Sequence, residues 1–160
     1  MHSLADRAPV VVSACLLGVR CTHDRGHNRS VAVEALAAEH RLIPVCPETA
    51  GGLPTPRPAA EQVEGGETVR TASGDDVSDA FRRGAEHALD VARRSGARLA
   101  VLKARSPSCG CHEIYDGTFS RTRRPGAGVT AARLTEAGLV VVSEEDVAER
   151  GIPDPMEAID

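Results

Sequence analysis

Four short apolar stretches, separated by segments of helical patterning, most constrain what this chain can fold into. Each stretch is nearly continuous in apolar residues, without strict alternation, which is typical of strands that are covered on both faces. The stretches are residues 10–14, 42–45, 99–102 and 139–142. We therefore expect four buried strands in one central sheet.

Helical patterning fills much of the chain between these stretches. The strongest pattern covers residues 77–95, and weaker ones cover residues 31–40 and 130–137. One face of the strongest predicted helix carries its apolar side chains, namely Val77, Phe81, Ala85, Ala88, Leu89 and Ala92. Strand and helix therefore alternate, which predicts an α/β protein with a parallel sheet.

Two inserts interrupt this alternation. The first is a proline-rich segment, residues 51–58, which is followed by a predicted β excursion through Thr71. The second is residues 114–119, where Asp116 and Gly117 stand between β-forming residues. An Asp-Gly pair in this setting predicts a small β-hairpin centred on it. Asp116 is accordingly interpreted as a turn residue rather than a catalytic one.

Length and charge exclude several classes of function. The chain has 160 residues, and we expect one domain that spans residues 1–160. A net charge of −4 and only three aromatic side chains argue against binding of large nucleic acids, which relies on positive charge and base stacking. We interpret the short basic run of Arg121, Arg123 and Arg124 as part of a solvated loop, with a contact for an anionic ligand as the alternative. No apolar run approaches the roughly 20 residues needed to span a bilayer, so no membrane partner is expected. A homodimer is compatible with the sequence.

The first nine residues lack the basic start and the long apolar stretch of a signal peptide. We therefore expect a cytoplasmic protein whose five cysteines stay reduced. Reduced cysteines favour metal ligation or catalysis over a framework of structural disulfides.

Three of the cysteines lie where predicted strands end. Cys15 directly follows the first strand, Cys46 directly follows the second, and Cys109 comes shortly after the third. The carboxyl ends of parallel strands share one edge of the sheet, where open α/β proteins bind ligands. The three thiols are therefore expected to meet in one crevice. The alternative, that each is a small buried hydrophobic residue, weakens for three cysteines in the same kind of position.

Three convergent thiolates suit either zinc or an iron–sulfur cluster. Structural zinc usually has four protein ligands arranged in Cys-x2-4-Cys pairs, and this chain has no Cys-x-x-Cys. A four-iron cluster held by three cysteines leaves one iron open, where it acts as a Lewis acid. Cys111 follows Cys109 after one residue, which raises the question of a redox pair or half a zinc site. We interpret Cys109 as a ligand and Cys111 as a bystander.

Three segments resemble the thiouracil desulfidase family, whose short members were long catalogued as a domain of unknown function. The segments are VSACLLG at residues 12–18, PVCPETAGGLPTPR at residues 44–57 and LKARSPSCG at residues 102–110. The resemblance implies a Rossmann-like α/β fold, a three-layer sandwich with a mostly parallel sheet. It also implies a [4Fe-4S] cluster with three ligands, Cys15, Cys46 and Cys109, and one open iron. The implied substrate is a small thiolated nucleobase, with 2-thiouracil giving uracil and hydrogen sulfide without net electron transfer.

The resemblance and the spacing together suggest roles for other residues. Glu48, two residues after Cys46, is predicted to activate water as a general base. Ser106 and Ser108 are predicted to hydrogen-bond the substrate or to relay a proton, with loop capping as the alternative for either one. A second tier of predicted substrate-binding residues comprises Arg57, Lys103, Glu61 and His23. For Arg57 and Glu61, a pairing with each other is also considered.

The chain departs from the family pattern at a few positions. Cys21 and His23 stand where an aromatic-containing run is usual, which bears on the shape of the pocket. A metal-binding Cys21 would close the cluster, and we favour a buried thiol instead. Two other functions stay open: a non-catalytic iron–sulfur or zinc module for sensing or partner docking, and the same chemistry on a thiolated nucleoside.

Overall fold

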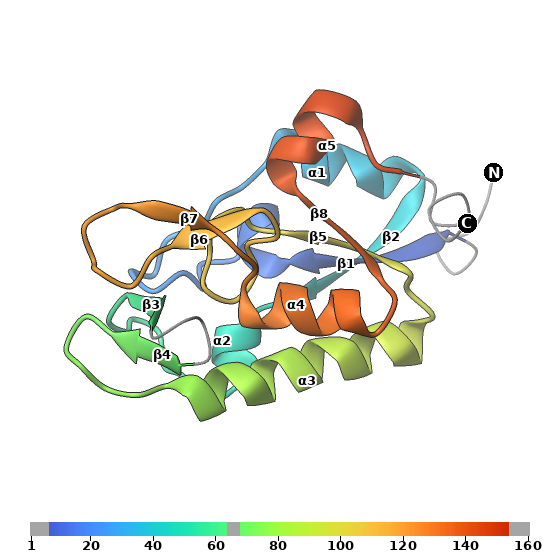
Figure 1. Cartoon of the computed structure of the whole chain (residues 1–160). Coiled ribbons are helices and arrows are strands. Elements are labelled where there is room, and N and C mark those ends of the chain that lie inside the picture. Colours follow the sequence, from blue (N-terminus) through green and yellow to red (C-terminus); the bar gives the residue numbers. More distant parts are fainter. Residues whose placement is uncertain (1–6, 64–67, 154–160) are drawn as a thin grey trace.

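A sheet of four parallel strands forms the centre of the molecule (Figure 1). The computed structural model describes residues 7–63 and 68–153, so residues 1–6 of the N-terminal segment lie outside the described part. The strand order is β2-β1-β5-β8, and every pairing is parallel. The strands are β1 (Ala8–Ser13), β2 (His40–Val45), β5 (Leu99–Leu102) and β8 (Val140–Ser143). The predicted α/β fold with a mostly parallel sheet is confirmed.

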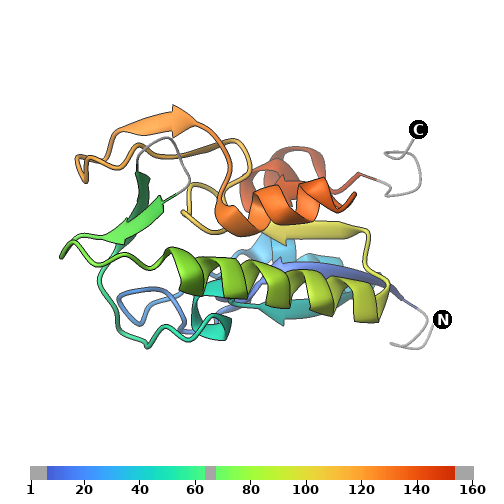
Figure 2. The same cartoon turned by 60° about the horizontal axis from the view of Figure 1, so that its bottom comes forward.

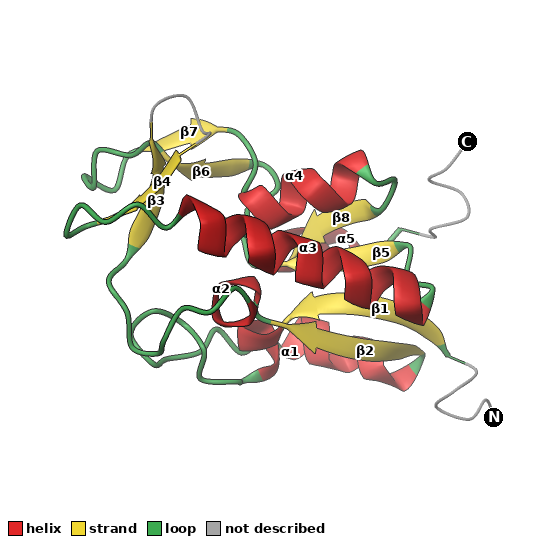
Figure 3. Cartoon of the chain, turned by 90° about the horizontal axis from the view of Figure 1, so that it is seen from below, coloured by secondary structure: helices red, strands yellow, loops and turns green. Residues whose placement is uncertain are grey.

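Helices cover both faces of this sheet and give three layers (Figures 1 and 3). One face carries α2 (Pro47–Ala50), α3 (Ser78–Ser95) and α4 (Val129–Glu136), and the other carries α1 (Val31–Glu34) and α5 (Glu144–Arg150). None of the helices that the structure describes is long and apolar enough to cross a membrane.

Two apolar clusters explain why the strand sequences are continuous rather than alternating. Val11 packs with Leu89 of α3 on one side of the sheet. Its neighbours Val10 and Val12 pack with Val33 of α1 on the other side. Successive side chains of a strand point to opposite faces, so a strand that is covered on both faces needs an apolar residue at every position.

Two small antiparallel hairpins extend beyond the carboxyl ends of the strands (Figures 1 and 2). The first pairs β3 (Ala60–Val63) with β4 (Thr68–Thr71), in agreement with the predicted β excursion through Thr71. The second pairs β6 (Glu113–Tyr115) with β7 (Arg123–Pro125). Both hairpins therefore stand at the edge where the three cysteines leave the sheet.

The predicted centre of the second hairpin is wrong. Asp116 and Gly117 begin a loop that runs to Arg123 instead of forming a tight two-residue turn. Thr118 N donates a hydrogen bond to Asp116 Oδ1 (3.0 Å), and Gly117 N donates one to Glu61 Oε1 (2.9 Å). The Thr118 amide is used in a local turn, and the Gly117 amide is used in a contact with β3. The second strand of the hairpin, β7, therefore starts only at Arg123.

Several predicted boundaries also shift. The helix predicted over residues 31–40 ends early: α1 stops at Glu34, a 3-10 turn covers Ala35–Ala38, and His40 already belongs to β2. In β2, His40 pairs with Ala8 of β1, so strand pairing takes precedence over local helical patterning there. Two short helices, α2 and α5, were not predicted, although α5 begins with a capping box.

Close contact between α2 and α3 depends on Gly84. A Cβ at this position would lie 1.9 Å from Pro47 O, whereas ordinary contact begins at 3.4 Å. We expect Gly84→Ala to lower the free energy of unfolding, because a strain of roughly 1–3 kcal/mol from overpacking exceeds the gain of about 1 kcal/mol in helix propensity. Urea unfolding measures the difference, and Arg93→Ala on the exposed face of α3 is the control. An unchanged midpoint in Gly84→Ala would contradict the contact.

Candidate active site

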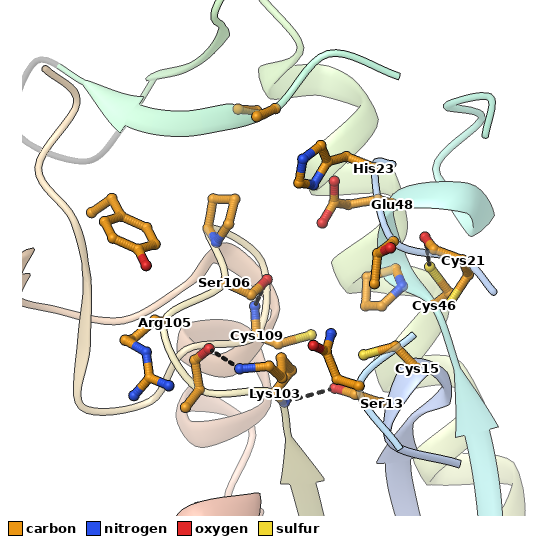
Figure 4. A pocket seen from close by; sticks show the side chains of 18 of the residues that line it. Ser13, Cys15, Cys21, His23, Cys46, Glu48, Lys103, Arg105, Ser106 and Cys109 are labelled. Carbon is orange, nitrogen blue, oxygen red and sulfur yellow. Dashed lines mark hydrogen bonds between the residues drawn. The ribbon is translucent and has the colours of Figure 1, made fainter. Parts of the chain in front are cut away.

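A cavity of about 610 Å³ lies at the carboxyl edge of the sheet (Figure 4). It is bounded by the ends of β1, β2 and β5 and by residues of both hairpins. Nine of the ten residues named from the sequence line it, namely Cys15, His23, Cys46, Glu48, Arg57, Glu61, Lys103, Ser106 and Cys109. The three thiols predicted to converge thus do share one cavity.

Each of these three cysteines is held at a strand end by a different local device. Cys15 lies in a 3-10 turn after β1, which ends at Gly18 with a φ of 89°, in the left-handed region that favours glycine. Cys46 follows β2 directly and is the residue before α2, whose first position is Pro47. Cys109 lies in the loop after β5. The strand ends and turns thereby fix where the three thiols lie.

The loop of Cys109 is tied down from two sides. Ser106 Oγ accepts hydrogen bonds from the backbone N–H groups of Ser108 and Cys109, each at 3.1 Å. Gly128, which caps α4, lies so close that a Cβ would stand 2.3 Å from the carbonyl carbon of Ser108. Cys109 is therefore buried in a loop with little freedom, and Ser106 performs the capping role considered for it.

Ser108 differs from Ser106 in where its side chain lies. It is fully buried, is not among the residues that line the cavity, and shares a hydrogen bond of 2.8 Å with Thr130 Oγ1. A direct contact with a ligand in the cavity is thus open to Ser106, whereas the Ser108 side chain is turned toward Thr130.

Burial dominates the electrostatics of the thiols. It raises the pKa of Cys109 to about 12 and also raises the pKa of Cys15, because a thiolate loses solvation inside the protein. Cys46 differs, since the hydrogen bond with the Cys21 thiol lowers its pKa and raises that of Cys21. Cys21 is thus the neighbour that influences Cys46 most, and Cys46 Sγ also donates a hydrogen bond to Cys21 O (3.7 Å).

The spacing of the thiols distinguishes between kinds of metal centre. In the described part of the chain, only Cys111, His112 and Asp146 bring three ligand atoms within 4.8 Å of one another. Four sulfurs around one zinc ion at about 2.3 Å would stand about 3.8 Å apart. The sulfurs of Cys15, Cys46 and Cys109 do not all lie within 4.8 Å of one another, which fits a cluster whose cysteines bind different iron atoms. The donor set and spacing therefore fit an iron–sulfur cluster better than a zinc ion.

Glu48 is positioned by a buried arginine. Arg57 Nε lies 3.1 Å from Glu48 Oε1, and the Arg57 side chain is only 5% exposed. The same guanidinium donates to Cys21 O (2.7 Å) and to Pro54 O (3.2 Å), which holds it in place. Burial raises the pKa of Glu48, while Arg57 opposes this rise. Arg57 thus pairs with Glu48, and the suggested pairing with Glu61 is wrong.

Lys103 is held by an acidic residue that was not predicted from the sequence. Its Nζ lies 3.0 Å from Glu144 Oε2, while the other oxygen of Glu144 accepts a hydrogen bond from Ala104 N (2.7 Å). Both side chains are mostly buried, so Lys103 is retained at the cavity instead of reaching into solvent. One signal was available, because Glu144 comes two residues after the end of the fourth apolar stretch, near the carboxyl edge that Cys15 and Cys46 share.

Glu61 anchors the loop between β6 and β7 at the cavity. Its Oε1 accepts hydrogen bonds from Gly117 N (2.9 Å) and Phe119 N (3.2 Å). The anchored loop brings Phe119 and Arg121 to the cavity lining, where they join Tyr115 from the end of β6. The sequence interpretation of the basic run is correct for Arg121 as a loop residue and wrong for Arg123 and Arg124, which lie in β7.

The comparisons with known proteins cover most of the chain. The family model described as 2-thiouracil desulfurase matches residues 10–146. The uncharacterized protein YbbK of Bacillus subtilis (strain 168) is 41% identical over 146 residues, which are 86% of this chain and 97% of that protein. A solved structure of a [4Fe-4S]-dependent thiouracil desulfidase, TudS, is 46% identical with a TM-score of 0.82, covering 89% of this chain and 95% of that one. The chain therefore belongs to the 2-thiouracil desulfurase family.

Proposed function

We propose that this desulfurase removes sulfur from 2-thiouracil by hydrolysis, with the help of a [4Fe-4S] cluster bound by Cys15, Cys46 and Cys109. The carbon–sulfur bond is replaced by a carbon–oxygen bond from water, giving uracil and hydrogen sulfide without net electron transfer. The observation that supports this most directly is the meeting of three strand-end thiols with a mostly buried carboxylate, Glu48, in one cavity. The similarity to TudS supports the cluster and the substrate.

Cys15, Cys46 and Cys109 would hold the cluster and leave one iron without a protein ligand, and such an iron would supply Lewis-acid activation of the thiocarbonyl group. Cys21 is not a ligand in this proposal. It keeps its hydrogen-bonding role beside Cys46 and leaves the fourth position free.

Glu48 acts as the general base. Arg57 holds Oε1, and Oε2 has no hydrogen-bond partner among the described residues, so this oxygen takes the proton from the attacking water. A positioned base of this kind contributes roughly 10²–10⁴-fold to a rate. Because Arg57 is held by backbone carbonyls, the carboxylate keeps one orientation toward the cavity.

Ser106 and Lys103 complete the polar lining. Ser106 Oγ already accepts two backbone N–H groups, so its own proton is available to donate to the substrate. Lys103 is fixed by Glu144 and brings a positive charge close to Cys15, where it favours anionic groups in the cavity. These residues orient the base and stabilise negative charge as sulfide leaves.

Two other functions were considered. A non-catalytic cluster or zinc module for sensing or docking has no use for a base and a lysine inside the cavity, so the lining favours catalysis. A thiolated nucleoside is supported by one observation: the cavity continues from the thiols to Tyr115, Phe119 and Arg121, beyond the space that a base needs beside Glu48.

The proposal is tested by anaerobic reconstitution with iron and sulfide, followed by metal analysis and an assay of sulfide release from 2-thiouracil and 2-thiouridine. We expect about four irons per chain and sulfide release that depends on the cluster. A folded protein that takes up zinc but no cluster would overturn the proposal, and a cluster-loaded protein without turnover would leave the sensing module as the function.

We expect Glu61→Ala to raise KM about tenfold, because the loop that carries Phe119 and follows Tyr115 loses an acceptor for two backbone amides. A tenfold change corresponds to about 1.4 kcal/mol, within the range for hydrogen bonds to a charged group. Glu61→Gln keeps an acceptor oxygen and is expected to stay within about threefold of wild type. Steady-state kinetics provide the test, and equal KM values in all three proteins would show that the loop does not contact the substrate.

A further inference from the structure

A second cluster of metal-binding side chains lies outside the cavity. The ligand atoms of Cys111, His112 and Asp146 all stand within 4.8 Å of one another. None of the three is among the residues that line the large cavity. We propose that these residues form a separate site that binds one Zn²⁺ ion and ties the loop after Cys109 to the start of α5.

The three side chains come from two segments that meet in space. Cys111 and His112 precede β6 and follow the Cys109 loop, whereas Asp146 lies in the first turn of α5. His112 Nε2 and Asp146 Oδ2 are 2.7 Å apart. Two ligand atoms bound to zinc at about 2.0–2.1 Å stand about 3.3 Å apart in a tetrahedron. The His112 and Asp146 side chains therefore have to move apart only slightly to bind the ion between them.

The donor set matches the preference of zinc. A thiolate, an imidazole and a carboxylate are its three usual protein ligands, and three of them with a water complete a tetrahedron. A small cavity of about 160 Å³ is lined by Cys111 and His112 and offers room for that water. Asp146 and the Cys111 thiolate together neutralise the two charges of the ion. The charge of the ion is thus neutralised by its own ligands, without residues of the large cavity.

Asp146 is already oriented for this role. Its Oδ2 accepts a hydrogen bond from Ser143 N (2.9 Å), while Ser143 Oγ accepts one from Asp146 N (3.1 Å). This capping box fixes the carboxylate with Oδ2 beside His112 Nε2, and such outer hydrogen bonds orient metal ligands. The nearby Glu113 and Glu145 are engaged in ion pairs with arginines, so they do not compete for the ion.

Equilibrium dialysis of the cluster-loaded protein against micromolar Zn²⁺, followed by elemental analysis, tests the proposal. We expect one zinc per chain with the iron content unchanged. Cys111→Ser, His112→Gln and Asp146→Asn should each weaken zinc binding at least tenfold, and Asp146→Asn keeps an acceptor for Ser143 N. His87→Gln, an exposed histidine on α3, is the matched control and should bind zinc like wild type.

A second arm separates this proposal from the proposed function. Zinc uptake is measured in the variant Cys15→Ser/Cys46→Ser/Cys109→Ser, which removes the thiols of the large cavity. One zinc per chain in this variant, lost on adding His112→Gln, supports the site whether or not the protein is a desulfidase. Absence of zinc from the cluster-loaded wild type, or zinc that all three ligand variants retain, overturns it.

Discussion

Glu48→Gln is expected to keep the full iron and sulfide content of the reconstituted protein while lowering sulfide release from 2-thiouracil by at least ~10²-fold. The amide is nearly isosteric and can still accept the hydrogen bond from Arg57, so the cavity keeps its shape. What is lost is the ability to take a proton from water. Anaerobic steady-state assays on protein with measured iron content separate this loss of base from loss of cluster.

The matched control for this change is Glu149→Gln, which removes one carboxylate from the exposed face of α5. It is expected to match wild type in iron content and in rate. Full activity in Glu48→Gln would remove Glu48 from the mechanism. A loss of iron in that variant would instead assign it to the support of Cys46.

The cysteine variants are expected to fall into two groups. Cys15→Ser, Cys46→Ser and Cys109→Ser should each lose most of the iron and reduce activity to that of cluster-free protein, because each removes a proposed ligand from the cavity. Cys21→Ser and Cys111→Ser should retain both. Iron analysis, the visible absorbance of the cluster and the sulfide assay report the outcome together.

The informative exception in this series is Cys21. Cys46 Sγ donates a hydrogen bond to Cys21 O (3.7 Å), and Cys21 also lines the cavity, so Cys21 is close enough to replace a ligand. If Cys21→Ser loses as much iron as Cys46→Ser, then Cys21 binds the cluster and the open iron disappears. Circular dichroism of each variant distinguishes loss of iron from loss of fold.

The parts of the fold that follow from local pattern were predictable from the sequence. Residues 99–102 were expected as a strand and form β5 with the same bounds, because a fully buried strand needs an unbroken apolar run. Residues 31–40 were expected as one helix, but pairing with β1 draws His40 into β2. The prediction of a tight turn at Asp116 and Gly117 was wrong for a similar reason, since the Gly117 amide donates a hydrogen bond to Glu61, which is distant in sequence.

In the candidate site, too, some features could be predicted from the sequence and others could not. The convergence of Cys15, Cys46 and Cys109 could be inferred because strand ends meet at one edge of a parallel sheet. The partners of charged side chains could not be inferred in this way. Arg57 pairs with Glu48 and Lys103 with Glu144 because of turns and loops that bring together residues distant in sequence. Patterning along the chain carries no information about such pairs.

The position of β1 at the middle of the sheet has a consequence for how the protein matures. β1 pairs with β2 on one side and with β5 on the other, and the proposed ligands leave from the ends of these three strands. β2 and β5 are far apart along the chain, so the trio is assembled only after long-range pairing is complete. If these three cysteines hold the cluster, we expect its insertion to follow the pairing of β1 with β2 and β5. Iron content would therefore report on conformational quality, and misfolded chains would be recognisable because they are colourless.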